Sequence, residues 1–246
     1  LEHRLLLVTG KGGTGKTTYA AALAVLAAAK GKRVIVAEVD TQISSMDSIF
    51  QTKTEFKPKN VRPGLDVCNI RWEFALESFL HRIVPVRRVV RMILRNKIVN
   101  RFLDFTPGSR ELVTLSIIGQ LVESYDLVIV DMPASGHAFS LLDILRSAMG
   151  LFRSGPVLTH VLQLQERFRD ASTRLVLVAL PEEMVVNETL ETYHRMRRAG
   201  MLTQKPVVFL NRATLPSLTE PERELISRLA SAELPGNLDE FVVAGS

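Results

Sequence analysis

Cysteine is almost absent from this chain, since Cys68 is the only one among 246 residues. A single thiol cannot form an internal disulfide, which excludes a disulfide-stapled secreted fold and favours a reducing cytoplasm. Long apolar runs are also missing. The longest, residues 20–29, is well short of the roughly 20 residues that cross a bilayer. We expect no secretory signal, because a glycine-rich motif follows the first strand-like segment, and we expect residues upstream of Leu1, which is not a methionine.

Acidic residues are outnumbered: 31 Lys and Arg against 26 Asp and Glu give a net charge of +5 and a pI of about 9.6. This excess is compatible with acidic partners and equally with an ordinary soluble enzyme. Any bias toward disorder is absent, because 46% of the residues are hydrophobic and the mean hydropathy is +0.14. We therefore expect a single globular domain over residues 1–246 with its own buried core.

Short apolar runs rich in Val, Leu and Ile alternate with helical stretches along most of the chain. The runs lack polar alternation, as strands buried on both faces of a parallel sheet do. We expect strands at 5–9, 33–39, 126–131, 174–180 and 207–210, with weaker candidates at 65–70 and 241–244, and helices at 16–30, 140–149, 182–199 and 219–232. The alternation predicts an α/β fold with a doubly wound, mostly parallel sheet.

One region breaks this rhythm. Between about residues 72 and 125 no convincing strand occurs, and the helical periodicity is interrupted by Pro85 and by Pro107-Gly108. We expect a helical insertion carried on the α/β core.

Residues 10–17 read Gly-Lys-Gly-Gly-Thr-Gly-Lys-Thr, the G-x-x-x-x-G-K-[ST] pattern of a phosphate-binding loop. The loop follows a strand and opens a helix, which is the setting that the pattern requires. Its backbone N–H groups and the helix N-terminus would face phosphate oxygens, Lys16 would reach the β- and γ-phosphates, and the Thr17 hydroxyl would ligate Mg²⁺. The expected nucleotide-binding residues here are Gly10, Lys11, Gly12, Gly13, Thr14, Gly15, Lys16, Thr17 and Thr18.

Two aspartates end predicted strands at the same edge of the sheet as this loop. Asp131 is placed to act on Mg²⁺, directly or through water, and Asp40 to approach the γ-phosphate. Each could instead cap the turn that follows its strand.

The second lysine of the loop, Lys11, points to a narrower class. Residues 10–18 resemble the deviant Walker A signature of the dimeric ATPases, which include the nitrogenase iron protein, the Min and Par ATPases and the arsenical-pump ATPases. In that class the extra lysine reaches the partner's nucleotide across a dimer interface. The resemblance implies a catalytic Lys11 acting in a dimer that sandwiches ATP; the alternative is a solvated lysine that contacts its own nucleotide.

Residues 131–137, Asp-Met-Pro-Ala-Ser-Gly-His, resemble the switch II signature of the ArsA-type ATPases, the arsenical pump-driving and tail-anchored-protein targeting enzymes. Residues 40–47 resemble their switch I, and 106–112, 180–184 and 207–212 match further stretches, so the resemblance covers nearly the whole chain. It implies that Asp40 orients the hydrolytic water and is a further candidate Mg²⁺ ligand, and that Asp131 binds Mg²⁺ through water.

The same resemblance gives roles to four more residues. Gly136 and His137 would sense the γ-phosphate, while Asn211, followed by Arg212, would bind the nucleotide by recognising adenine. An amide is suited to pair with both N6 and N7 of adenine. The alternatives are a turn cap for Asn211 and a structural hydrogen bond for His137.

The chain also departs from the family pattern. Switch I lacks the usual proline and has Ile43 in place of a histidine, which puts the rate of hydrolysis in doubt. Arsenite binding needs about three thiolates and a zinc clasp a Cys-x-x-Cys pair, and Cys68 supplies neither. The arsenite-pump interpretation is therefore disfavoured.

A basic segment lies in the insertion: residues 82–101 hold seven Lys or Arg and no acid. From residue 86 on, we expect the apolar residues to share one side of a helix and four arginines the other, the apolar set being Val86, Val89, Val90, Ile93 and Leu94, and the basic set Arg87, Arg88, Arg91 and Arg95. Such a helix fits an anionic membrane or an apolar client segment, or it packs on its own core with solvated arginines outside.

We therefore expect a Mg²⁺-dependent ATPase, cytoplasmic or peripheral at a membrane, whose homodimer or heterodimer opens and closes around ATP to handle a client protein or membrane partner. No nucleic acid partner is expected. One alternative is a Min- or Par-like positioning protein, and another is a slow subunit that pairs with a homologous chain.

Overall fold

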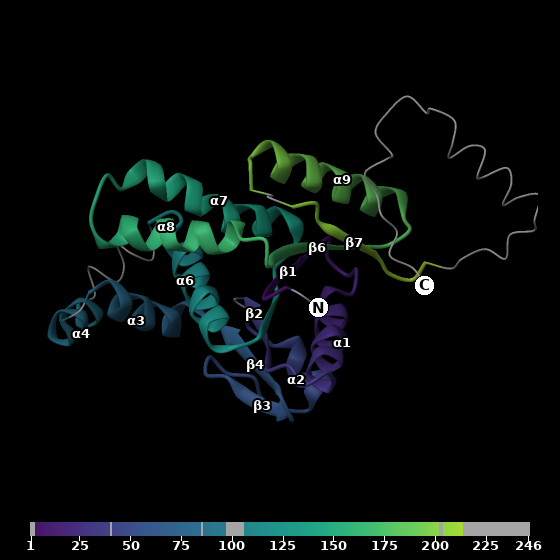
Figure 1. The fold of residues 1–246 in the computed structure, drawn as a ribbon, viewed down its shortest axis with the longest axis horizontal. Coiled ribbons are helices and arrows are strands. Elements are labelled where there is room, and N and C mark those ends of the chain that lie inside the picture. Colours follow the sequence, from purple (N-terminus) through teal and green to yellow (C-terminus); the bar gives the residue numbers. More distant parts are fainter. Residues whose placement is uncertain (1–2, 40, 85, 97–105, 202–203, 214–246) are drawn as a thin grey trace, which may run out of the picture.

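The computed structural model describes residues 3–39, 41–84, 86–96, 106–201 and 204–213. They form one seven-stranded sheet covered on both faces by helices (Figure 1). None of the helices in this described part of the chain has the length and apolar character of a membrane-spanning segment.

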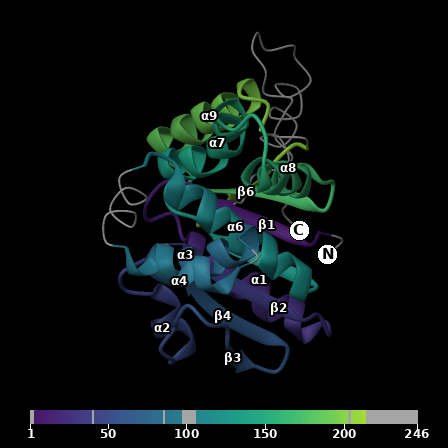
Figure 2. The same cartoon turned by 90° about the vertical axis from the view of Figure 1, so that its left-hand side faces the viewer.

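The strands run in the order β3-β4-β2-β5-β1-β6-β7, and Figure 2 shows most of them following one another down the molecule. All neighbours pair in parallel except the edge strand β3, which is antiparallel to β4. The bounds are β1 Leu5–Thr9, β2 Val34–Val39, β3 Lys59–Arg62, β4 Leu65–Ile70, β5 Leu127–Asp131, β6 Thr173–Ala179 and β7 Val207–Leu210. The α/β, mostly parallel sheet predicted from the sequence is confirmed.

Helices cover the two faces unequally. On one face α1 (Lys16–Ala29) packs through Ala20, Ala21, Ala24 and Ala27 onto alternate side chains of the strands, with Met46 of α2 (Ser45–Phe50) beside it. The other face carries α6 (Ser109–Ser124), α7 (Ser135–Leu151), α8 (Pro156–Arg169) and α9 (Glu183–Arg198).

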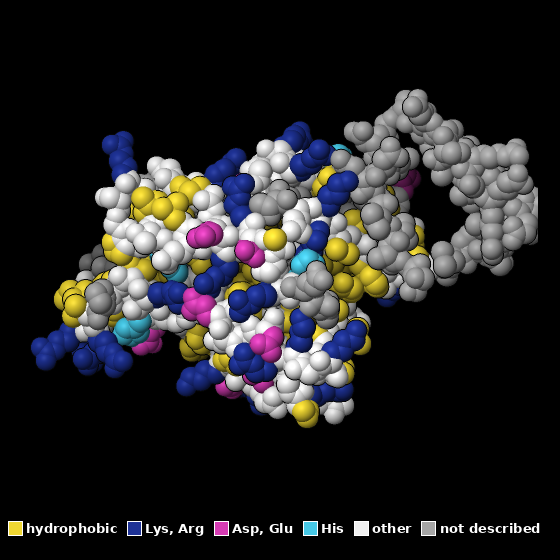
Figure 3. All heavy atoms as spheres, in the orientation of Figure 1, with side chains coloured by type: hydrophobic (Ala, Val, Ile, Leu, Met, Phe, Trp, Pro, Cys, Tyr) yellow, Lys and Arg dark blue, Asp and Glu magenta, His cyan; other side chains and the backbone are white. Residues whose placement is uncertain are grey.

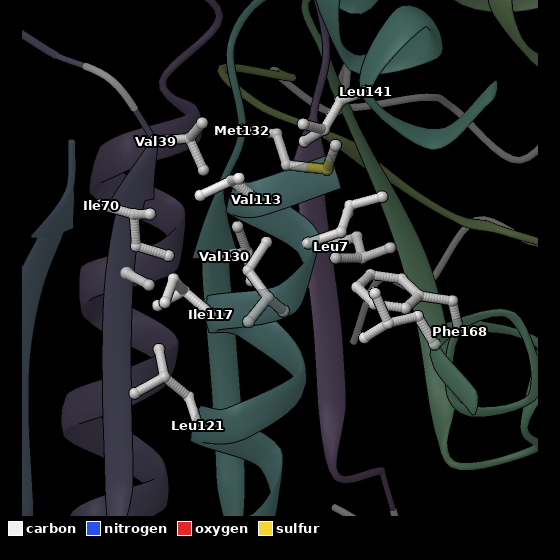
Figure 4. Close-up of a cluster of buried hydrophobic side chains, with 14 of the residues drawn as sticks. Leu7, Val39, Ile70, Val113, Ile117, Leu121, Val130, Met132, Leu141 and Phe168 are labelled. Atoms are coloured by element: carbon white, nitrogen blue, oxygen red, sulfur yellow. The ribbon is translucent and has the colours of Figure 1, made fainter. Parts of the chain in front are cut away.

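The larger core lies beneath these last helices. Figure 4 shows Val130 of β5 between Ile117 of α6 and Leu7 of the neighbouring strand, with Met132 and Leu141 above them. Within each of the central strands, successive residues face the two cores in turn, so both faces of the sheet are apolar and the strands appear in the sequence as continuous hydrophobic runs.

Between β4 and β5 the described residues form α3 (Trp72–Ile83), α4 (Arg87–Arg95) and α6. Helix α4 lies at one end of the long axis of the molecule, beside α3 (Figure 1).

Several elements differ from the sequence expectations. β1, β4 and β7 have the expected bounds, whereas β3, α2 and α8 were not predicted, and α7 begins at Ser135 rather than at residue 140. β3 was not predicted because its side chains are mostly exposed and its sequence contains no apolar run. Its pairing with β4 stabilises it as a strand. The strand expected at 241–244 and the helix expected at 219–232 lie outside the described residues.

Candidate nucleotide-binding site

The glycine-rich loop turns sharply between β1 and α1. Gly10, Gly13 and Gly15 have φ of 147°, 81° and 93°, in the left-handed region that side chains disfavour. A Cβ on Gly10 would lie 2.1 Å from the carbonyl oxygen of Val178 on β6, so no larger residue fits there without moving that strand. Glycine is thus needed at the start of the loop by the close approach of β6, and it is favoured at Gly13 and Gly15 by their positive φ.

Lys16 is the first residue of α1, and its side chain is hydrogen-bonded back to the glycine-rich loop. Its Nζ donates a hydrogen bond of 3.1 Å to the carbonyl oxygen of Lys11, which also accepts one of 2.9 Å from the Thr14 hydroxyl. Burial lowers the pKa of Lys16 below its ordinary value, although the charges of Asp131 and Glu188 oppose that shift. The ammonium group is therefore held over the loop, where a phosphate would offer it a stronger partner.

Thr17 and Asp131 join the helix to the sheet. The Thr17 hydroxyl donates to Asp131 Oδ2 over 2.5 Å. Asp131 is 9% exposed at the end of β5, and burial raises the pKa of its carboxyl despite the Thr17 hydrogen bond and the charge of Lys16. Its other oxygen, Oδ1, is buried and has no hydrogen-bond partner among the described residues.

An unpartnered carboxylate oxygen beside a hydroxyl fits the needs of a magnesium ion, which prefers oxygen ligands and keeps several waters. No three His, Cys, Asp or Glu side chains cluster for a metal within the described ranges. Thr17, Asp131 and phosphate oxygens could hold Mg²⁺ without such a cluster.

The structure adds a carboxylate that the sequence analysis missed. Glu38 of β2 is 1% exposed and lies directly beside Asp131 in the register of β2 and β5. It accepts hydrogen bonds from the Ser44 hydroxyl and, over 2.9 Å, from the Ser45 backbone N–H at the start of α2. Burial raises the pKa of Glu38, and the charge of Asp131 adds to that shift. The sequence does contain a signal for Glu38, because it is a charged residue within an otherwise apolar strand.

Lys11, on which the dimeric class was inferred, lies against helix α9. Its Nζ is 3.6 Å from Glu188 Oε2, and both side chains are about one-third exposed. The other oxygen of Glu188 accepts a 2.7 Å hydrogen bond from the Ser135 hydroxyl. Glu188, also missed from the sequence, thereby links the phosphate-binding loop to the segment expected to be switch II.

That segment runs from the end of β5 into α7. The Thr9 hydroxyl of β1 donates 2.9 Å to the Pro133 carbonyl oxygen, so the two strand ends stay together. Gly136 and His137 lie exposed in the first turn of α7, where the His137 backbone N–H donates to the Ala134 carbonyl oxygen. No described neighbour crowds the Cα of Gly136.

Asn211 directly follows β7, and its side chain is hydrogen-bonded to the glycine-rich loop. Its Nδ2 donates 2.8 Å to the Thr14 carbonyl oxygen, and its Oδ1 accepts 2.9 Å from the Arg212 backbone N–H. A Cβ on Gly15 would approach Asn211 Nδ2 to 2.5 Å. Asn211 thus contacts the loop itself, while the Arg212 side chain is exposed beside it.

The structure gathers the loop, Thr17, Asp131 and Asn211 at one edge of the sheet. Thr18 is in the first turn of α1 and exposed. Asp40, the expected water-orienting residue, lies outside the described residues, although β2 ends at Val39 immediately before it.

Comparisons with known proteins agree with this arrangement. A family model described as an anion-transporting ATPase matches residues 3–154. ATPase BagA of Mycobacterium tuberculosis is 30% identical over 233 residues, which cover 89% of this chain and 67% of the relative. Arsenical pump-driving ATPases of Acidiphilium multivorum and Escherichia coli are each 25% identical over 267 residues, which cover 96% of this chain and 45% of theirs.

Proposed function

Because this chain belongs to the ArsA family of anion-transporting ATPases and hydrolyses ATP, we propose that it is a Mg²⁺-dependent dimeric switch that closes on ATP and opens after hydrolysis. The hydrogen bond between Thr17 and Asp131 carries this proposal, because it sets the loop threonine against a buried carboxylate as a magnesium site requires.

The loop binds the phosphates of ATP through its backbone N–H groups and the N-terminus of α1. Lys16 exchanges the Lys11 carbonyl oxygen for the β- and γ-phosphate oxygens. Asn211 holds the loop in shape through Thr14 and contributes to the adenine side of the site.

Magnesium, when bound, neutralises charge that develops between the β- and γ-phosphates. Thr17 would hold it directly and Asp131 through a water molecule. Asp40, directly after β2, orients the attacking water. Gly136 and His137 at the start of α7 respond to the γ-phosphate, and the contact of Ser135 with Glu188 carries that response to α9.

Exposed apolar side chains support a dimer at this edge. Among the large hydrophobic residues of the described chain, Ile43 and Met184 are the most exposed, at 87% and 75%. Ile43 follows the end of β2 and Met184 the end of β6, so both lie at the edge that carries the loop. A second copy that closed over the nucleotide would cover them and would receive Lys11.

The cargo of the switch is a client protein or a membrane partner and not arsenite. Cys68 is buried, and burial raises the pKa of its thiol to about 12. A protonated, enclosed thiol is a poor ligand, and two copies of the chain supply only two of the three thiolates that an arsenite site needs.

A mixing experiment tests the dimer and the assigned roles together. Asp40→Asn and Lys11→Ala should each abolish Mg²⁺-dependent ATP hydrolysis. If Lys11 acts on the partner's nucleotide and Asp40 on its own, an equal mixture of the two variants regains about a quarter of wild-type activity, since half of the dimers then hold one intact site. Co-purification of one variant with a differently tagged copy of the other establishes that subunits exchange.

An inactive mixture, with exchange demonstrated, would refute action in trans. Full activity of either variant alone would remove its assigned role.

A further inference from the structure

Helix α4 carries a basic outward face that the nucleotide site does not use. Its arginines at 87, 88, 91 and 95 are all exposed. No ion pair joins any of the four to a described side chain, whereas nearby Arg82 of α3 is paired with Glu123. Lys and Arg side chains gather at the tip of the molecule where α4 lies (Figure 3).

The opposite side of α4 holds the helix on the protein. Val90 is fully buried, and Ile93 and Leu94 pack against the larger core. Val86 and Val89 were expected on this packed side, but they are 52% and 37% exposed. Val89 faces away from the core because it lies about 100° around the helix axis from Val90. Val86 precedes the first residue of the helix and has an extended backbone, so the helical periodicity does not fix the direction of its side chain.

Met92 lies in the middle of the arginines. It is 65% exposed, and together with Arg88, Arg91, Arg95 and Asn96 it lines a shallow hollow of about 440 Å³. An exposed thioether surrounded by three guanidinium groups gives this face both apolar and cationic character.

We propose that α4 binds the anionic headgroup layer of a phospholipid membrane, with Arg88, Arg91 and Arg95 on the phosphates and Met92 among the upper acyl carbons. This names the membrane partner of the switch and, for its ATP dependence, rests on the proposed function.

Charge and shape favour lipid over an apolar client segment. Helix α4 contains four arginines and no acid, which complements a negative surface. An apolar peptide requires a concave apolar groove, whereas α4 stands at an end of the molecule and offers a shallow hollow edged by cations.

Vesicle co-sedimentation tests the proposal with the full chain. Wild type should sediment with mixed phosphatidylcholine–phosphatidylglycerol vesicles and not with phosphatidylcholine alone. A basic residue near such a surface contributes about fivefold to binding, so the triple variant Arg88→Gln, Arg91→Gln, Arg95→Gln should bind on the order of a hundredfold more weakly.

The matched control removes the same charge elsewhere. Lys57, Lys59 and Arg62 are exposed on and beside edge strand β3, away from α4, and their triple glutamine variant should bind as wild type does. Met92→Gln, with all arginines present, should weaken binding several-fold and make it more sensitive to salt. All variants should keep the wild-type melting temperature and basal ATP hydrolysis.

Equal binding to neutral and anionic vesicles, or equal losses in the two triple variants, would overturn the proposal. So would failure of wild type to bind vesicles, even if duplex DNA or polyglutamate bound through the same arginines. Vesicle binding by a chain that stays monomeric with ATP would refute the proposed function and leave the lipid site standing.

Discussion

Lys11 and Glu188 form an ion pair within one chain, with 3.6 Å between Nζ and Oε2. The pair fastens the second lysine of the phosphate-binding loop to helix α9, so a Lys11 that acts on a partner's nucleotide must first leave Glu188.

We expect Glu188→Gln to favour the closed dimer. Glutamine keeps the acceptor for Ser135 and removes the charge that holds Lys11. A partly exposed ion pair is worth up to about 1 kcal/mol, and two such pairs open when one dimer closes. The protein concentration that gives half-maximal ATP hydrolysis should therefore fall by roughly two- to thirtyfold. Glu191→Gln, exposed on the same helix, is the control. A higher concentration requirement for Glu188→Gln would show that the pair supports the dimer.

Asp131→Asn should stabilise the nucleotide-free protein while abolishing hydrolysis. Burial raises the pKa of Asp131, so its charged form costs stability at pH values above the folded-state pKa. The cost is relieved as the pH falls through that pKa toward the ordinary Asp value of about 3.9. We expect a gain of about 1 kcal/mol, or roughly 2–4 °C in Tm, at pH 7, shrinking as the solution is acidified.

Asp126→Asn is the opposite case and serves as the control. Hydrogen bonds from Arg33 lower the pKa of Asp126, so its charge stabilises the fold above the ordinary Asp pKa and that contribution is lost as the pH falls. The variant should melt lower than wild type at pH 7, and the difference should vanish in acid. Shifts of the same sign in the two variants would contradict the burial argument.

Asn211→Ala tests what the amide does. Because Nδ2 binds the Thr14 carbonyl oxygen, its loss should weaken the binding of ATP and GTP alike by about fivefold, the worth of one hydrogen bond near 1 kcal/mol. Nucleotide competition measurements would detect this. If adenine recognition is its main role, the loss will fall on ATP alone and the preference over GTP will disappear.

Gly10→Ala should destabilise the fold without nucleotide. The added Cβ meets the backbone of β6 at a φ of 147°, and neither strand can move away cheaply. We expect a loss of about 2–4 kcal/mol, read as a fall in Tm of roughly 5–10 °C. Gly12→Ala, where nothing lies within 4 Å, should leave Tm nearly unchanged. A similar fall in both variants would refute the steric explanation.

Most of the fold could be predicted from the sequence because the strands are buried on both faces of the sheet. Strands such as β1 and β4 therefore appear in the sequence as continuous apolar runs. The glycine-rich loop after the first run indicates where the candidate site lies. α8 was missed although it buries four side chains, because its apolar residues are interleaved with polar ones and it follows a Gly-Pro break.

The contacts between elements could not be read in this way. Glu38 reads as an exception in an apolar strand, and only the pairing of β2 with β5 sets it beside Asp131. Glu188 is far from Lys11 in the sequence, and the residues around neither of them predict that the two side chains are in contact. Sequence periodicity reports which face a residue takes, whereas these partnerships depend on how α9 and β5 pack.

The four alanines that α1 turns toward the sheet restrict how this protein can evolve. The fully buried side chains of α1 are methyl groups, so the helix can lie close to the sheet with Thr17 within reach of Asp131. A valine or leucine at Ala20 or Ala24 would push the helix outward and separate the two oxygens. The alanine-rich face of this helix thus sets the distance on which the candidate magnesium site depends, whereas the solvent side of the helix should accept larger residues without that effect.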